Sequence, residues 1–441
     1  MPRDRTQETR ESEDEFDVRH APLVSGDIVD QSSNDLLPQS GFLGTQGSGE
    51  MEVSRSKIFV NSNAPFSTFI CGVQGSGKSH TTACFLENAI LSSPVLGRAG
   101  KPLSALVFSY GEYSSVGSGF SVSEVAFLGS PNSAFPKLTP VRKINVLVSA
   151  TNPGIRRLYE RLPNVTVTAF KLKPWLLDIG TILTFMNVHT DKEGPLYMAQ
   201  FNNVLREIAT ECDGRFDYRM LKPKLKACRF DFRQMKFLQM RLNLLESFLD
   251  LNNAYPDPQY RPGEITIIDM SCPFVDASTA CTLFKLGLQR YLQSQAPGKM
   301  VVLDEAHKYM LNVPGAKALN ESLLTTIRLQ RHYGTRVIVS TQEPTLLTSL
   351  IALCSVVIVH RFTSPEWFAA LKKHIIIPQE DEKDVIRAIE QLRTGTALVY
   401  SSNAVLGRNG DGTLDKGAGR LVVMKMRKRI TFDGGQSILC E

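Results

Sequence analysis

A glycine-rich stretch, "GVQGSGKS", occupies residues 72–79 and fits the pattern G-x-x-x-x-G-K-[ST]. In this pattern glycines let backbone N–H groups turn inward around phosphate oxygens, the lysine reaches the terminal phosphates and the hydroxyl binds Mg²⁺. An apolar run precedes the stretch and a helical pattern follows it, so the positive end of a helix dipole would also face the phosphates. The residues that we expect to bind a nucleotide here are Gly72, Gly75, Ser76, Gly77, Lys78, Ser79 and His80.

An acidic pair, Asp304 and Glu305, follows an apolar run at residues 300–303. The run predicts a buried strand, which would bring the pair to the sheet edge where ligands of α/β proteins bind. Asp304 would join the nucleotide-binding set and, together with Ser79, hold Mg²⁺. Glu305 would polarise the water that attacks the γ-phosphate.

Two further side chains would complete a hydrolytic site. Gln342 directly follows the apolar run 335–341, where it would sense the γ-phosphate or orient water. Arg331, on the helical pattern before that run, would neutralise charge in the transition state, in its own chain or in a neighbouring subunit. Each of the two arginines there, Arg328 and Arg331, fits the solvated surface of a helix about as well as it fits this catalytic role.

Nine short runs rich in β-branched residues supply the strands that must position these side chains. Many are apolar throughout, which is typical of strands buried on both faces of a parallel sheet. Helical patterns at 79–91, 277–295 and 319–334 separate several runs, and this alternation predicts a doubly wound, mainly parallel α/β sheet. The runs are "STFICGV", "SALVFSY", "INVLVSA", "NVTVTAF", "EITIIDM", "KMVVLDE", "TRVIVST", "SVVIVHR" and "TALVYSS".

Composition divides the chain into a leader, a core and a tail. Residues 1–55 are polar and charged, then rich in Ser and Gly, and predict a disordered leader. The α/β core is expected over 56–435, with a helical insertion at about 195–252, and a short tail occupies 436–441. Within the core, a stretch rich in Ser and Gly at 110–138 predicts a long surface loop.

The ordered set of motifs carries a resemblance. In chain order, the glycine-rich loop, "TIIDMS", "VVLDEAH", "RLQRHYGTRVIVSTQEP", "SVVIVHRF" and "GTALVYSS" resemble the HerA/FtsK group of P-loop ATPases, and more closely the HerA-like proteins of fungi. The resemblance covers about residues 59–435 and implies a P-loop NTPase fold of the RecA-like, FtsK/HerA type. It also implies Walker A roles for Lys78 and Ser79, Walker B roles for Asp304 and Glu305, a sensor role for Gln342 and an arginine-finger role for Arg331.

Net charge, apolar stretches and cysteine spacing indicate the cellular compartment and the kinds of partner to expect. The formal net charge is +6 and the pI about 8.8, a mildly basic balance that is compatible with a polyanionic partner. No apolar stretch reaches the roughly 18 residues that a membrane span needs, and the N-terminus has no signal-peptide core. The eight cysteines form no C-x-x-C pair. We therefore expect an intracellular protein, cytoplasmic or nuclear, with no membrane partner.

Two basic segments bear on a nucleic-acid partner. Residues 215–241 interleave aromatic side chains with Lys and Arg, as a groove for single-stranded nucleic acid would. Aromatic residues at these spacings are more often the packing face of a helix, with the basic residues in water. Residues 423–430 alternate in polarity and predict a half-exposed strand with Arg427 and Arg429 on its wet side. Nucleic acid is thus a candidate partner.

Together these features predict an Mg²⁺-dependent ATP-binding and ATP-hydrolysing protein, working as a homo-oligomeric motor or translocase on nucleic acid or a protein complex. One alternative is a nucleotide-gated interaction protein with little hydrolysis, which would have no need of Glu305. A second is a nucleic-acid-binding module with a subordinate ATPase. The guanine-reading motif N-K-x-D does not occur, which disfavours a GTPase.

Overall fold

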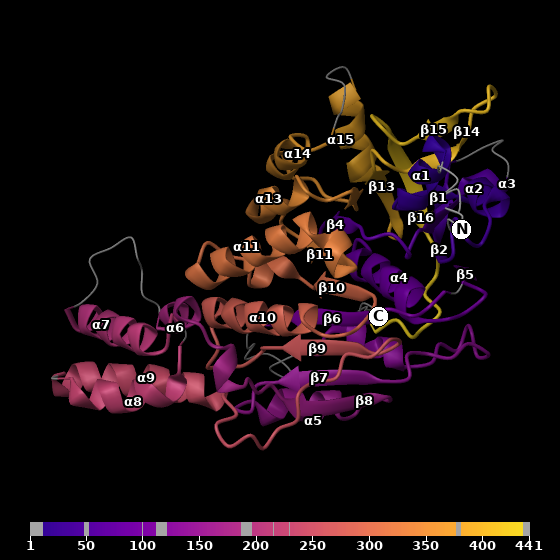
Figure 1. Ribbon diagram of the computed structural model, residues 1–441. Helices are drawn as coiled ribbons and strands as arrows, with labels where there is room; N and C mark the ends of the chain where they lie inside the picture. Colours follow the sequence, from indigo (N-terminus) through magenta and orange to yellow (C-terminus); the bar gives the residue numbers. More distant parts are fainter. Residues whose placement is uncertain are drawn as a thin grey trace, which may run out of the picture.

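The computed structural model describes residues 12–47, 53–98, 100–111, 121–186, 196–214, 216–228, 230–375 and 381–434. Within these residues a single 16-stranded sheet runs through the molecule, with helices on both faces (Figure 1). The strand order is β15-β14-β1-β3-β2-β16-β13-β12-β4-β11-β10-β6-β9-β7-β8, and β5 pairs with β2 outside this path.

Eight neighbouring strands, from β12 to β8 in this order, pair in parallel. With β13 they account for all nine predicted strands, so the expected mainly parallel α/β sheet is confirmed. Their carboxyl ends lie along one edge, where a doubly wound sheet places its ligands. The strands are β4 (Ser67–Cys71), β6 (Ser104–Ser109), β7 (Ile144–Val148), β8 (Val165–Ala169), β9 (Ile265–Asp269), β10 (Lys299–Leu303), β11 (Thr335–Thr341), β12 (Val356–Val359) and β13 (Thr396–Tyr400).

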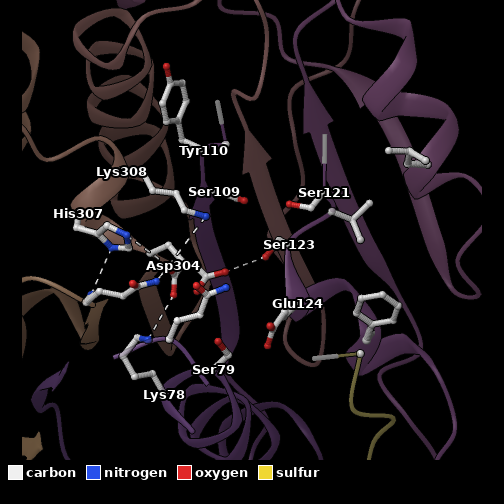
Figure 2. Close-up of a pocket in the computed structure, with 18 of the residues that line it drawn as sticks. Lys78, Ser79, Ser109, Tyr110, Ser121, Ser123, Glu124, Asp304, His307 and Lys308 are labelled. Atoms are coloured by element: carbon white, nitrogen blue, oxygen red, sulfur yellow. Dashed lines mark hydrogen bonds and ion pairs between the residues drawn. The ribbon is translucent and has the colours of Figure 1, made fainter. Parts of the chain in front are cut away.

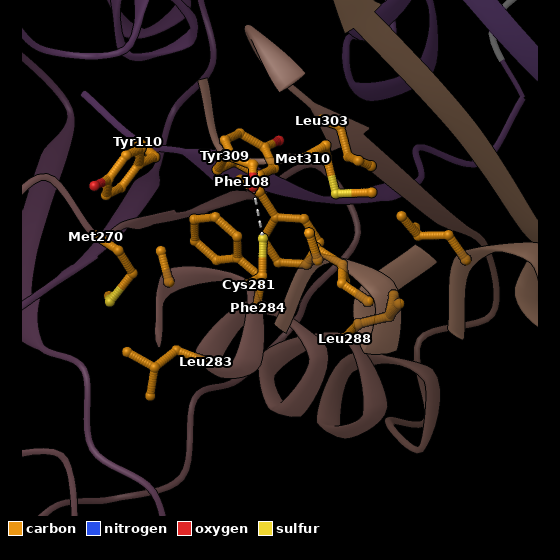
Figure 3. Close-up of a cluster of buried hydrophobic side chains, with 14 of the residues drawn as sticks. Phe108, Tyr110, Met270, Cys281, Leu283, Phe284, Leu288, Leu303, Tyr309 and Met310 are labelled. Atoms are coloured by element: carbon orange, nitrogen blue, oxygen red, sulfur yellow. Dashed lines mark hydrogen bonds between the residues drawn. The ribbon is translucent and has the colours of Figure 1, made fainter. Parts of the chain in front are cut away.

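Burial on both faces explains why most of these strands are apolar, whereas β8, at the edge of the sheet, alternates and has two exposed threonines. Successive side chains of a strand point to opposite faces of the sheet. In β6, Leu106 and Phe108 therefore join one core, whereas Ala105 and Val107 join the other. Figure 3 shows part of the first core, where Phe108 stacks on Phe284 of α10 with ring centroids 4.7 Å apart.

The helices divide between the two cores. One core contains residues of α10, α11, α13, α14, α15 and the helical insertion, and the other contains residues of α4, α5 and η1. No described helix has the length and apolarity that a bilayer span requires. The helices named here are α4 (Lys78–Ile90), η1 (Glu124–Gly129), α5 (Pro153–Tyr159), α10 (Ala277–Leu292), α11 (Pro314–Arg328), α13 (Thr348–Ile351), α14 (Pro365–Leu371) and α15 (Glu382–Gln391).

A helical insertion is present where the sequence predicts one. Three helices lie within the expected span of about 195–252 and project together from one end of the molecule (Figure 1). The short α6 (Ile179–Phe185) precedes them and contacts α10. The three helices are α7 (Leu196–Glu211), α8 (Tyr218–Ala227) and α9 (Phe232–Ser247).

The second half of the sheet corrects the prediction of a disordered leader. Within 1–55, residues 12–47 form ordered elements, and β1 and β2 pair with strands close to the other end of the chain. The ordered core therefore begins well before residue 56. The strands of this half are β1 (Leu23–Ser25), β2 (Ser40–Gln46), β3 (Lys57–Val60), β5 (Gly97–Arg98), β14 (Val405–Arg408), β15 (Leu414–Lys416) and β16 (Leu421–Met426). The helices beside them are α1 (Glu13–His20), α2 (Gly26–Gln31) and α3 (Val53–Ser56).

The segment after β16 is anchored to α4 by one carboxylate. Glu87 of α4 is fully buried, and it accepts hydrogen bonds from Arg427 Nη1 at 2.6 Å and from the backbone N–H of Thr431 at 2.9 Å. The sequence predicts Arg427 and Arg429 on the wet side of a strand, but they are only 8% and 2% exposed. The prediction was wrong because the partners of Arg427 lie on a distant helix.

Candidate active site

A cavity of about 860 Å³ opens at the carboxyl edge of the parallel strands. It brings together the glycine-rich loop, the acidic pair and the glutamine that the sequence singles out (Figure 2). Its lining includes Gln74, Gly75, Lys78, Ser79, Tyr110, Ser123, Glu124, Phe127, Leu158, Arg161, Leu162, Asp304, Glu305, His307, Lys308, Gln342 and Gly434.

The glycine-rich loop runs from the end of β4 into the first turn of α4. Gly72, Gly75 and Gly77 have φ of 154°, 72° and 111°, a region that side chains disfavour. A Cβ at Gly75 would meet nothing within 4 Å, so the backbone here is open to the cavity. The first N–H groups of α4 have no carbonyl partner within the helix. The loop can therefore present backbone donors to phosphate oxygens.

Ser76 and Lys78 are both buried in this loop. The Ser76 hydroxyl donates to the Val73 carbonyl at 2.7 Å, which closes the turn. Lys78 is 3% exposed, and its Nζ lies 3.2 Å from the same carbonyl and 3.8 Å from Glu305 Oε1. Burial lowers the pKa of Lys78, while the nearby carboxylates of Glu305 and Asp304 oppose that shift. The ammonium group thus lies between the loop and the acidic pair.

The acidic pair lies where β10 ends, between β11 and β6. Asp304 is buried, and its Oδ2 accepts a hydrogen bond from the Ser123 hydroxyl at 3.2 Å. Burial, with the charges of Glu305 and Glu124, raises the pKa of Asp304 to about 7. Glu305 has φ 48° and ψ 47°, a left-handed conformation that is uncommon outside glycine and that clusters at functional sites.

Gln342 and His307 surround the Glu305 carboxylate. The Gln342 amide nitrogen Nε2 donates to Glu305 Oε2 at 2.8 Å, and His307 Nε2 lies 3.6 Å from the same oxygen. The backbone N–H of Gln342 donates to His307 Nδ1 at 3.3 Å. Burial lowers the pKa of His307, so its imidazole is neutral and accepts that hydrogen bond. Gln342, which follows β11, and His307, in the turn after β10, therefore fix the position of the Glu305 carboxylate.

Besides Ser76, which is buried in the loop, two predicted residues have their side chains outside the cavity. The His80 imidazole lies 2.8 Å from the Arg427 carbonyl and 3.4 Å from Asp433 Oδ2, so its side chain is directed to the segment after β16. Arg331 is exposed on α12 (Gln330–Tyr333), which precedes β11. It lies at the amino edge of the sheet, about 20 Å of strand away from the cavity of its own chain.

Glu124 and Phe127 line the cavity, yet the sequence did not single them out. They lie in the stretch 110–138, which was predicted as a surface loop, but η1 packs Val125 and Leu128 into the core. Burial raises the pKa of Glu124, and its interaction with the Ser79 hydroxyl opposes that shift. The signal in the sequence was the group of apolar residues between Glu124 and Gly129, whose spacing is typical of a short helical turn packed on a core.

The residues present fit a magnesium ion that is bound together with phosphate. Mg²⁺ keeps several waters and takes one or two protein oxygens plus those of the substrate phosphates. Ser79 and Asp304 supply such oxygens at the same end of the cavity (Figure 2). Among the described residues no group of three or more His, Cys, Asp or Glu could hold a metal ion by itself. The donor set thus suits Mg²⁺ carried by a nucleotide.

Comparison with known proteins bears on the fold. No family model and no curated protein matches the chain. Among solved structures it is similar to VirB4 of Thermoanaerobacter pseudethanolicus, with a TM-score of 0.50 and 11% identity over 88% of this chain and 96% of that chain. It also matches the plasmid coupling protein TrwB, with a TM-score of 0.41 and 13% identity over 90% and 97% of the two chains. The genome packaging NTPase B204 from Sulfolobus turreted icosahedral virus 2 matches at a TM-score of 0.29 and 11% identity, over 80% and 95%. With its glycine-rich loop after β4 and its parallel sheet, the chain has the P-loop NTPase fold that it shares with VirB4.

Proposed function

We propose that this chain binds ATP with Mg²⁺ and hydrolyses it. The observation that carries the proposal is the Glu305 carboxylate, which Gln342 and Lys78 hold beside Asp304 at the mouth of the glycine-rich loop. A protein that only bound nucleotide would not need a carboxylate in a left-handed conformation at this position.

Each residue has a role in this proposal. The N–H groups of the loop and the Lys78 ammonium bind the β- and γ-phosphates, and Ser79 and Asp304 hold Mg²⁺, which neutralises phosphate charge. Glu305 accepts a hydrogen bond from the attacking water, and Gln342 orients both the Glu305 carboxylate and that water. The water oxygen bonds to the γ-phosphorus as the bond to the β–γ bridging oxygen breaks, which yields ADP and phosphate.

An oligomer is part of the proposal because of Arg331. Its exposed position at the amino edge of the sheet separates it from the cavity of its own chain. An arginine finger at this position would act on the cavity of a neighbouring copy, as fingers supplied in trans do.

We also propose that the chain belongs to the HerA/FtsK group, closest to the fungal HerA-like proteins.

The substrate of such a motor is a nucleic acid or a protein complex. Two lysines of the basic stretch 215–241 are already engaged, since Lys222 pairs with Glu246 and Lys224 pairs with Glu211. Phe216 and Tyr218 are buried. At these positions the contacts favour the packed helix face over a nucleic-acid groove, although Phe232 of the same stretch is exposed. Free thiols at the described cysteines suit a reducing compartment, in keeping with a cytoplasmic or nuclear location.

The test is phosphate release from ATP by the purified full chain, with Mg²⁺ and with EDTA. We expect Mg²⁺-dependent turnover that falls by about 10²- to 10⁴-fold in Glu305→Gln, with ATP binding retained. Lys78→Ala should lose binding as well. Turnover that survives in Glu305→Gln would refute the mechanism. Binding without turnover in the wild type would favour the nucleotide-gated interaction protein.

A further inference from the structure

The cavity continues beyond the residues that the phosphates need. At 860 Å³ it lies at the upper end of the range for small-molecule sites. Past Ser79 and Glu124 its lining changes from polar to mainly apolar. We call this second part the annex, and its residues are Val122, Phe127, Leu158, Arg161 and Leu162.

Phe127 is held rigidly in the annex. Its ring lies 5.9 Å from the ring of Phe432, centroid to centroid. A Cβ at Gly434 would come within 2.2 Å of Phe127 Cδ2, so the C-terminal segment, which follows β16, packs directly against the ring. The Asn132 side chain donates to the carbonyls of Arg429 and Thr431, each at 3.1 Å, which ties that segment down. An aromatic surface that is already ordered binds a flat ligand at little entropic cost.

The two parts of the cavity differ in charge. The phosphate end is strongly charged: the buried Lys78 ammonium and the N-terminus of α4 favour an anion, and the carboxylates of Asp304 and Glu305 favour a cation bound with it. In the annex the cationic side chain is Arg161, which is exposed, and the remaining side chains are aliphatic or aromatic. A ligand that fits both parts has an anionic head and a flat, largely apolar ring at the other end.

We propose that the annex binds the base of the nucleotide, which stacks on Phe127 while Arg161 covers its outer edge. This inference rests on the proposed function, because it places the base of a nucleotide whose phosphates bind the glycine-rich loop. A planar base suits the annex because stacking on an aromatic ring is strong and does not depend on hydrogen bonds. The ribose would then pass Ser79 and Glu124, which lie together between the two parts (Figure 2).

Calorimetric titration with two probes tests the proposal. The probes are a non-hydrolysable ATP analogue and inorganic tripolyphosphate, which has the phosphates but no base, each with Mg²⁺. We expect Phe127→Ala to weaken binding of the analogue by about 5- to 100-fold and to leave tripolyphosphate binding unchanged. Phe127→Tyr, which keeps the ring, should restore analogue binding, and Lys78→Ala should weaken both probes.

A matched control separates stacking from packing. Phe432 packs behind Phe127 but does not line the cavity. Phe432→Ala should therefore weaken binding of the analogue much less than Phe127→Ala does. Equal weakening of both probes by Phe127→Ala, or unchanged binding of the analogue, would overturn the annex as a base site while leaving the phosphate site intact. Failure of the wild type to bind either probe would overturn the proposed function itself.

Discussion

The contact between α4 and the C-terminal segment predicts a large loss of stability from one substitution. Arg427 is 8% exposed, and its guanidinium donates to Glu87 and Asn88 and to the carbonyls of Phe42 and Cys84. Arg427→Met keeps much of the apolar volume but leaves the buried Glu87 carboxylate without its counter-charge. Removing one partner of a buried pair costs about 3–5 kcal/mol.

Urea unfolding of wild type and variant measures this loss as a shift in midpoint at an unchanged m-value. The backbone N–H groups of Ile430 and Thr431 still donate to Glu87 in the variant, so we expect the lower half of that range. The double variant Glu87→Gln, Arg427→Met has no stranded charge and should be more stable than Arg427→Met alone. A loss below about 1 kcal/mol, or a double variant as unstable as the sum of the two singles, would refute the pairing as the source.

Two further predictions concern residues that the sequence assigned to the site. Arg331→Ala should reduce ATP turnover by at least about 10³-fold without weakening ATP binding, and mixing it with Lys78→Ala should restore turnover, because the mixed interface pairs an intact cavity with an intact arginine; an inactive mixture would contradict action in trans. Burial alone would lower the pKa of His80, but its interactions with Asp433, with Cys84 and with the Arg427 carbonyl raise it to about 10. Because the folded pKa lies above the ordinary value of 6.5, the charged ring stabilises the fold fully below pH 6.5 and loses this effect as the pH rises through 10. His80→Gln should therefore lower the melting temperature more at pH 6 than at pH 10, whereas the exposed His332→Gln should change it little at either; an equal effect of His80→Gln at both values would contradict a charged His80.

The parallel half of the fold and the centre of the site were predictable because their signals are local. Most of the nine predicted strands are apolar or β-branched runs, since burial on both faces acts on nearly all of their residues. The glycine-rich loop, Asp304, Glu305 and Gln342 follow three such strands directly. Parallel pairing then brings the ends of those strands to one edge of the sheet.

The rest depends on partners far away in the sequence. Residues 12–47 look too polar to fold, but they pair with β3 and with the distant β14 and β16, and they pack against Val405 and Leu414. Arg427 looks like a surface residue because its carboxylate partner lies 340 positions away. Glu124 and Phe127 are hidden in a stretch whose Ser and Gly content predicts a loop, although the apolar residues between them fix that turn against the core.

The pairing of β2 with β16 also sets the timing of folding in the cell. A ribosome adds about 5–20 residues per second, so roughly 20–75 s pass between the synthesis of Gln46, the end of β2, and that of Leu421, the start of β16. During that interval the residues of β2 from Gly44 to Gln46 lack their partner β16, and an unpaired edge is a template for association with other chains. We therefore expect a stalled or truncated product that lacks β16 to associate with other chains through this part of β2 more readily than a domain whose neighbouring strands are consecutive.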